Sequence, residues 1–263
     1  MSARTLPDYT NPPAVETVLG VRFSPIEGWT LLHYGLLSSK VKGEYPKSEL
    51  RPPIGEVTIQ ISAESNFANV PVRCWFINAD DTQLIQVQNN CFIRNWRKTE
   101  KTPNYLHYDV IRPLFERDWT EFLQFLLEQH LAPPSVWQCE VTYINQFVRG
   151  RDWQDFNDLG GLYPAWNGMR PEGLFSRAEM VSFAVSYSLP DGRGSLQLVS
   201  QPGIRRSDGK EIIQLTITAL GKPSSSQTLD LLEWLDLGRS AVVRGFAGFT
   251  DKGVQEKKWG LRE

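Results

Sequence analysis

The sequence has little cysteine and little histidine. Its 263 residues include three cysteines, Cys74, Cys91 and Cys139, and no two of them form a Cys-x-x-Cys pair. An odd number of cysteines, each within an apolar stretch, argues against a disulfide framework and against a zinc site. The three histidines lack metal-ligand spacings such as HExxH. We therefore expect three buried, reduced thiols and no bound metal.

Recognisable catalytic motifs are also absent. The chain contains no GxSxG, no GxxxxGK[ST] and no GxGxxG that opens a helix. The Gly192-Arg193-Gly194 sequence lies between two strand patterns and predicts a hairpin turn, and Asp80-Asp81 also reads as a turn. The sequence therefore predicts no catalytic residue and no cofactor. A hydrolase that uses carboxylates is the weakest of the hypotheses considered.

Neither a charge excess nor a long apolar run is present. The formal net charge is −2, and both signs are interspersed. A protein dedicated to coating nucleic acid usually has a clear basic excess, so we do not expect a nucleic-acid partner. No apolar run reaches the roughly 20 residues that span a bilayer, and the N-terminus lacks the apolar core of a secretion signal. These features predict no membrane segment and a cytoplasmic location.

Apolar and aromatic residues, in contrast, are plentiful. Hydrophobic residues make up 41% of the chain, and nine residues are tryptophan. This composition excludes intrinsic disorder and predicts a large core.

Two similar octets indicate an internal duplication. The sequence ETVLGVRF occupies residues 16–23, and EVTYINQF occupies residues 140–147. After each octet we predict a helical segment led by tryptophan, then short strands, then a long amphipathic helix. Two repeats, residues 1–133 and 134–263, are therefore predicted to form one cooperative domain.

Hydrophobic periodicity places the elements of each half. In the first half we predict strands at 14–23, 57–61, 72–77, 83–88 and 91–96, helices at 28–44 and 106–130, and a loop at 46–56. In the first helix, a spacing of three to four residues assigns the buried face to Trp29, Leu32, Leu36, Leu37 and Val41.

The second half is expected to repeat this order. We predict strands at 136–148, 181–189, 195–201 and 211–220, a short helical segment at 153–166, a loop at 167–176 and a helix at 228–250. The last 13 residues read as a loose tail anchored by Trp259. The fold class is therefore α+β: a duplicated strand–helix–strands–helix unit that forms an antiparallel sheet with helices packed on one face.

Four strings carry a resemblance to a known family. They are NPPAVE at residues 11–16, LIQVQ with FIRNWR at 84–88 and 92–97, CEVTYIN at 139–145, and GFAGFT at 245–250. Together they resemble a sporadically distributed bacterial family of about this length that has no established activity. The resemblance implies an accessory gene, of the kind found in mobile or defence loci such as CRISPR or toxin–antitoxin loci. The element order is also similar to duplicated GyrI-like proteins, which hold small amphipathic molecules between their halves.

Glu16 and Glu140 are candidate ligand-binding residues. Both lie in the first strand of their repeat, on the face opposite the aromatic residues. If the repeats are related by an approximate twofold axis, the two carboxylates would share one region, where they could bind a cationic ligand or hold a proton. The alternative is a pair of solvent-facing glutamates, or glutamates that pair with Arg22 or Arg149.

Arg94, Trp96 and Arg97 are candidate partner-binding residues. They lie in residues 92–101, which interleave basic and aromatic side chains. Such a strip can contact a protein or stack on bases. It can equally be an edge strand with outward arginines and with Phe92 and Trp96 in the core.

The sequence thus predicts a non-enzymatic accessory or regulatory protein that binds a protein partner through a sheet edge or this strip. The alternative is a small-molecule sensor with its ligand between the repeats.

Overall fold

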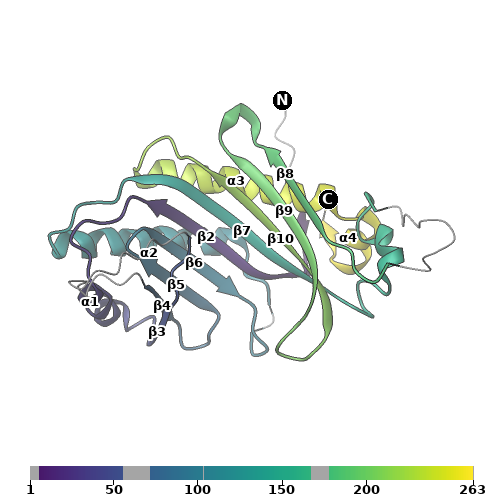
Figure 1. Ribbon diagram of the computed structural model, residues 1–263, viewed down its shortest axis with the longest axis horizontal. Helices are drawn as coiled ribbons and strands as arrows, with labels where there is room; N and C mark the ends of the chain where they lie inside the picture. The colour runs from purple at the N-terminus through teal and green to yellow at the C-terminus, as the bar shows by residue number, and fades with distance from the viewer. Residues whose placement is uncertain (1–5, 56–71, 103, 167–177, 263) are drawn as a thin grey trace, which may run out of the picture. The chain divides into compact units, whose positions relative to one another are not determined.

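The structure is a computed structural model that describes residues 6–55, 72–102, 104–166 and 178–262 (Figure 1). The first half of the chain contains two helices, α1 (Leu31–Val41) and α2 (Tyr108–Glu128). Its strands are β1 (Asp8–Tyr9), β2 (Ala14–Phe23), β3 (Lys47–Arg51), β4 (Arg73–Ile77), β5 (Gln83–Gln88) and β6 (Cys91–Arg97).

The second half begins with the long strand β7 (Val136–Val148) and contains two helices, α3 (Thr228–Phe249) and α4 (Lys252–Lys258). Short 3-10 helices lie at η2 (Phe156–Gly161) and η3 (Pro190–Gly192). The remaining strands are β8 (Phe183–Ser188), β9 (Ser195–Ile204), β10 (Glu211–Gly221) and β11 (Leu261–Arg262). The predicted strand at 57–61 and the predicted loop at 167–176 lie outside the described residues.

The predicted α+β class is confirmed. Within the described residues, the main sheet has nine strands in the hydrogen-bonded order β3-β4-β5-β6-β2-β7-β10-β9-β8, and β1 pairs with β11 in a separate two-stranded sheet. In the first half, β3, β4, β5 and β6 form a meander that ends next to β2. In the second half, β8, β9 and β10 form a meander that ends next to β7. A duplicated unit predicts this shared order, but the duplication itself stays a prediction.

The chain divides into two compact units, and neither is one continuous half. Unit 1 consists of Met1–Thr17, Val141–Gly221 and Asp236–Glu263, and unit 2 consists of Val18–Glu140 and Lys222–Leu235. The boundaries therefore fall inside β2, β7 and α3. A long strand or helix can supply residues to both units because its length exceeds what one unit needs.

The core of unit 2 is aromatic. From β6, Phe92 contacts Phe115, Trp119 and Phe122 of α2, with ring centroids 5.2–6.0 Å apart. Trp29, just before α1, packs against Phe122 and Phe125 of the same helix. Pairs of this kind contribute about 0.5–1.5 kcal/mol beyond the area they bury. The apolar face of the amphipathic helix predicted at residues 106–130 therefore faces the sheet.

In unit 1, Trp259 is a core residue. It is 2% exposed, stacks on Phe147 at 5.3 Å and contacts Phe246 of α3 at 5.2 Å. The predicted anchor is confirmed, but the predicted loose tail is wrong. The segment forms α4 and then β11, because Asp251 caps α4 by accepting from the Val254 amide at 3.0 Å and β11 pairs with β1.

Two further predictions in the first half are wrong. The predicted loop at 46–56 contains β3, whose register runs from Lys47 opposite Ile77 to Arg51 opposite Arg73. Its five residues are all exposed, as in an edge strand, so no apolar alternation marks it in the sequence. The flanking prolines favoured a loop, and pairing with β4 overrides them.

In α1, Leu32 and Leu36 are 77% and 49% exposed, whereas the sequence placed them in the core. The buried positions are Tyr34, Leu37 and Val41. Leucines lie on several faces of this short helix, so spacing alone did not identify the buried face.

Among the described helices, none combines the length and the apolar character that a bilayer span requires.

Candidate functional site

A buried ion pair joins β6 to α2 in unit 2. The side chains of Arg94 and Asp118 are each 1% exposed, and the Arg94 guanidinium is paired with Asp118 Oδ2. The Tyr45 hydroxyl donates to the same oxygen at 2.6 Å and accepts from Arg94 Nη1 at 2.6 Å. Burial raises the pKa of Tyr45 above its usual value. The α1–β3 connection, β6 and α2, which are distant in the sequence, therefore meet at the Asp118 carboxylate.

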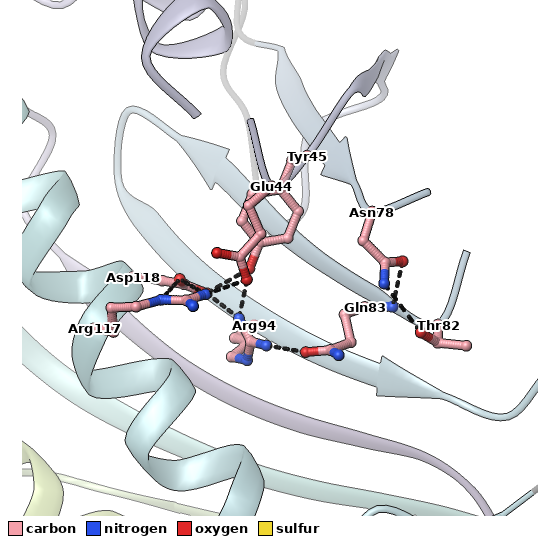
Figure 2. A network of polar contacts seen from close by, with 8 residues as sticks. All are labelled: Glu44, Tyr45, Asn78, Thr82, Gln83, Arg94, Arg117 and Asp118. Carbon is pink, nitrogen blue, oxygen red and sulfur yellow. Dashed lines mark hydrogen bonds and ion pairs between the residues drawn. The ribbon is translucent and has the colours of Figure 1, made fainter. Parts of the chain in front are cut away.

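The second carboxylate oxygen is also hydrogen-bonded (Figure 2). Arg117 donates to Asp118 Oδ1 from Nε at 3.0 Å and from Nη2 at 2.7 Å, and it also pairs with Glu44. On the other side, Arg94 contacts Gln83 of β5. A buried charge is tolerated only when it is paired and hydrogen-bonded, and this one is. The network therefore serves to hold α2 and the α1–β3 connection on the sheet.

This network corrects the predicted partner-binding strip. Arg94 and Trp96 are 1% and 2% exposed, so neither can contact a partner. Phe92, Arg94 and Trp96 share one face of β6 because side chains alternate along a strand. That face packs on α2. Only Arg97, on the opposite face, is partly exposed.

Trp75 lies at the centre of a different basic and aromatic cluster in unit 2. The guanidinium carbons of Arg51, Arg73 and Arg97 lie 4.6, 5.5 and 5.8 Å from the Trp75 ring centroid. All three distances are within the range of cation–π attraction, which contributes about 0.5–1 kcal/mol at exposed sites. We call these four residues the Trp75 cluster. It brings together side chains from β3, β4 and β6.

Neighbouring polar side chains position the Trp75 cluster. Arg73 Nη1 donates to Gln86 Oε1 at 2.9 Å, and Gln86 Nε2 donates to Asn95 Oδ1 at 2.6 Å. Arg51 pairs with Glu49, and Arg97 Nε donates to the Asp81 carbonyl at 2.7 Å. Partial burial and, to a smaller extent, the Arg51 charge lower the pKa of Arg73.

Two donors in the Trp75 cluster have no acceptor within the described part of the chain. They are the Trp75 indole Nε1 and Arg73 Nε, and both atoms are buried. A buried donor without an acceptor costs roughly 1–3 kcal/mol. An acceptor brought by a ligand would therefore be favourable there.

The sequence identified Arg97 but not the other members of the cluster. Arg51 fell in the predicted loop. Arg73 and Trp75 alternate with buried Cys74 and Phe76, and this alternation is the signal that could have placed them on the face of Arg97.

The two glutamates belong to different units. Glu16 is a partly exposed residue of β2, in the part of that strand that belongs to unit 1. Glu140 belongs to unit 2, where its carboxylate lies 3.7 Å from the Arg22 guanidinium. Its side chain is 19% exposed. This ion pair is the local contact that the alternative interpretation of Glu140 anticipated, and a shared carboxylate site stays a prediction.

Metal-ligating residues do not gather in the described ranges, where no group of three or more His, Cys, Asp or Glu side chains has the required arrangement. The three cysteines are free and buried. His33 has a local role at the start of α1, where its Nδ1 accepts from the Thr30 amide at 2.9 Å.

Comparisons of the chain with protein-family models, with curated proteins and with solved structures each gave no match.

Proposed function

We propose that this protein is a non-enzymatic binding protein that recognises an acidic, extended segment of a partner protein at the Trp75 cluster. The observation that supports this proposal is the gathering of three guanidiniums within 5.8 Å of one indole ring. Guanidinium forks match carboxylates in a bidentate geometry, and arginine and tryptophan are enriched among residues that dominate interfaces.

Charge balance favours an anionic partner. Glu49 forms an ion pair with Arg51, and Asp81 Oδ1 forms an ion pair with Lys47 at 2.9 Å. Among the described residues, one of the three guanidiniums of the Trp75 cluster, that of Arg51, forms an ion pair with a carboxylate. A partner carboxylate would reduce the repulsion between Arg51 and Arg73, and it could accept from the Arg73 Nε donor.

The position of the cluster favours an extended partner. Among the described strands, β3 is the terminal strand of the sheet order, and its five residues are exposed (Figure 1). Extended peptides add to such edges through main-chain hydrogen bonds, while alternate side chains give specificity. Arg51 is a residue of this strand, so a peptide on β3 would present its side chains to the cluster.

A protein partner is favoured over a nucleic acid by global charge. The net charge of −2 would repel a polyanionic backbone outside the cluster. An acidic peptide segment carries fewer charges over a shorter length, so one local group of arginines is sufficient for it.

We expect a fluorescein-labelled poly-glutamate peptide to bind the full chain at low salt, with an affinity that falls as salt is added. Arg73→Gln and Arg97→Gln should each weaken binding about twofold to fivefold, since each removes one partly exposed charge contact. Trp75→Leu should weaken it as well, because the guanidiniums lose the ring that orders them. Fluorescence anisotropy measures all of these affinities.

Arg205→Gln is the matched control. Arg205 is an arginine of unit 1 that pairs with Asp208 at 2.6 Å in the turn after β9, and its loss should leave peptide binding unchanged. Labelled poly-glutamine and oligothymidine complete the test. Stronger binding of oligothymidine than of poly-glutamate, or equal loss with Arg205→Gln, would refute the proposal.

A further inference from the structure

Unit 1 contains a pocket lined by residues of the β8–β9 hairpin and of α3. Its volume is about 410 Å³, which lies within the range of about 300–1,000 Å³ typical of small-molecule sites. Leu196 and Leu198 of β9 form one wall, and Phe249 of α3 contributes to the opposite wall. Every residue that lines it belongs to unit 1.

Two glycines of α3 line this pocket. A Cβ at Gly245 would lie 2.7 Å from Leu196 Cδ2, so glycine allows the helix to approach β9 closely. A Cβ at Gly248, one turn later, would meet no atom within 4 Å. Gly248 lines the pocket, and its missing side chain therefore leaves the volume open.

The chemistry of the lining is apolar with one cation. Among the described residues that line the pocket, Arg244 of α3 is the only one with a charge. Its side chain is exposed, and its Nε lies 3.4 Å from Ser240 Oγ. Hydroxyl groups come from Ser188 and from Tyr187, which is 54% exposed. An apolar cavity with an arginine at its wall is complementary to an apolar molecule with one anionic group.

We propose that this pocket binds a small amphipathic carboxylate. The apolar body lies against Leu196, Leu198 and Phe249, and the carboxylate is bound by the Arg244 guanidinium. Arginine is suited to this task because its planar donors bind both carboxylate oxygens. The site is independent of the Trp75 cluster, which belongs to unit 2.

The probe is 8-anilinonaphthalene-1-sulfonate, an apolar fluorescent anion. The full chain should bind it saturably at one site, with displacement by decanoate or by 2-naphthoate and not by decanol. Arg244→Gln should weaken probe binding about twofold to fivefold, since an ion pair of an exposed arginine contributes about 0.2–1 kcal/mol. Gly248→Leu should abolish binding, because its side chain would occupy the pocket.

Gly35→Leu is the matched control for Gly248→Leu. Gly35 is an exposed glycine of α1 whose Cβ would also meet no atom within 4 Å, and the change should leave binding intact. Near-ultraviolet circular dichroism verifies that each variant is packed, since this probe also binds molten states. If Gly248→Leu does not fold, Ala241→Leu fills the pocket from an earlier turn of α3.

The two competing carboxylates distinguish two chemical classes of ligand. Preferential displacement by decanoate indicates a fatty acid, and preferential displacement by 2-naphthoate indicates an aromatic acid. Undiminished probe binding in both filled variants would overturn the site. Equal displacement by decanol and decanoate would overturn the role of Arg244, and so would an unchanged affinity in Arg244→Gln. Absence of saturable binding to the unmodified chain would overturn the proposal as a whole.

Discussion

Replacing Asp118 with alanine is expected to destabilise the protein by about 3–5 kcal/mol, because it leaves the buried Arg94 guanidinium without its counter-charge. The side chains of both residues are 1% exposed, so water cannot compensate for the loss. Tyr45 would lose the acceptor of its hydroxyl at the same time. Urea unfolding followed by tryptophan fluorescence measures the change as a lower midpoint.

A variant that removes the whole network distinguishes the effect of the ion pair on stability from the effect of side-chain packing. Arg94→Met, Asp118→Leu and Tyr45→Phe together replace the ion pair and the hydroxyl with apolar groups of similar size. Such replacements are often neutral or stabilising, so the triple variant should be more stable than Asp118→Ala. A triple variant that is less stable than Asp118→Ala would show that the network contributes more than mutual compensation of its charges.

Glu116→Ala serves as the control for Asp118→Ala. Glu116 lies on the same helix and pairs with Arg112 at 3.5 Å, but its side chain is 43% exposed. Loss of an exposed pair at this spacing changes stability by about 0.5 kcal/mol or less. A cost for Glu116→Ala equal to that of Asp118→Ala would contradict the importance given to burial.

Stability is expected to fall steeply above pH 9. Burial raises the pKa of Cys91 from 9.0 to about 11 and those of Cys74 and Cys139 to about 12. Burial also raises the pKa of Tyr9 and of Tyr34 from 10.0 to about 12. The folded protein therefore keeps protons that the unfolded chain releases in this range. The contribution is complete below about pH 9 and is lost as pH rises toward 12.

The size of this effect follows from the shifts. One pKa unit corresponds to about 1.4 kcal/mol, so Cys91 alone accounts for a loss of stability on the order of 3 kcal/mol as pH rises from about 9 to about 11. Urea midpoints measured from about pH 7 to about pH 11 should decline, and Cys91→Ala should make the decline shallower. A flat profile up to about pH 11 would contradict the burial of these groups.

Thiol reactivity gives an independent test. Burial keeps the three cysteines protonated, and a thiol is a poor nucleophile compared with its thiolate. The folded protein should therefore react slowly with a disulfide reagent near neutral pH, and all three thiols should react once it is unfolded. Rapid reaction of the folded protein would place at least one cysteine at the surface.

Periodicity identified most elements because it is a local property. β2, β5 and β7 have the predicted bounds, and α2 and α3 lie within the predicted helical ranges. The wrong assignments include β3 and β11, which form by pairing with distant partners. Their own residues carry a weak pattern, so the sequence around them did not reveal the partner.

The candidate sites likewise combine features that the sequence indicates with features that only tertiary contacts determine. Asp118 falls on the apolar stripe of α2, between Phe115 and Phe122, and a carboxylate at such a position predicts a buried cation opposite. The sequence contained that signal but could not show that Arg94 is the cation. The Trp75 cluster required the registers of β3, β4 and β5 and the pairing of β5 with β6 before four residues spread over 47 positions could meet.

The sequence alone determined the α+β class, the large aromatic core and the positions of the long helices and strands, because spacing and composition act within a few residues of each other. Tertiary structure decided which face of β6 is buried, which leucines of α1 are exposed and where the pocket of unit 1 opens. Those outcomes depend on strand register and on the rotation of each helix against its neighbours. Both are set by contacts between residues that are far apart in the chain.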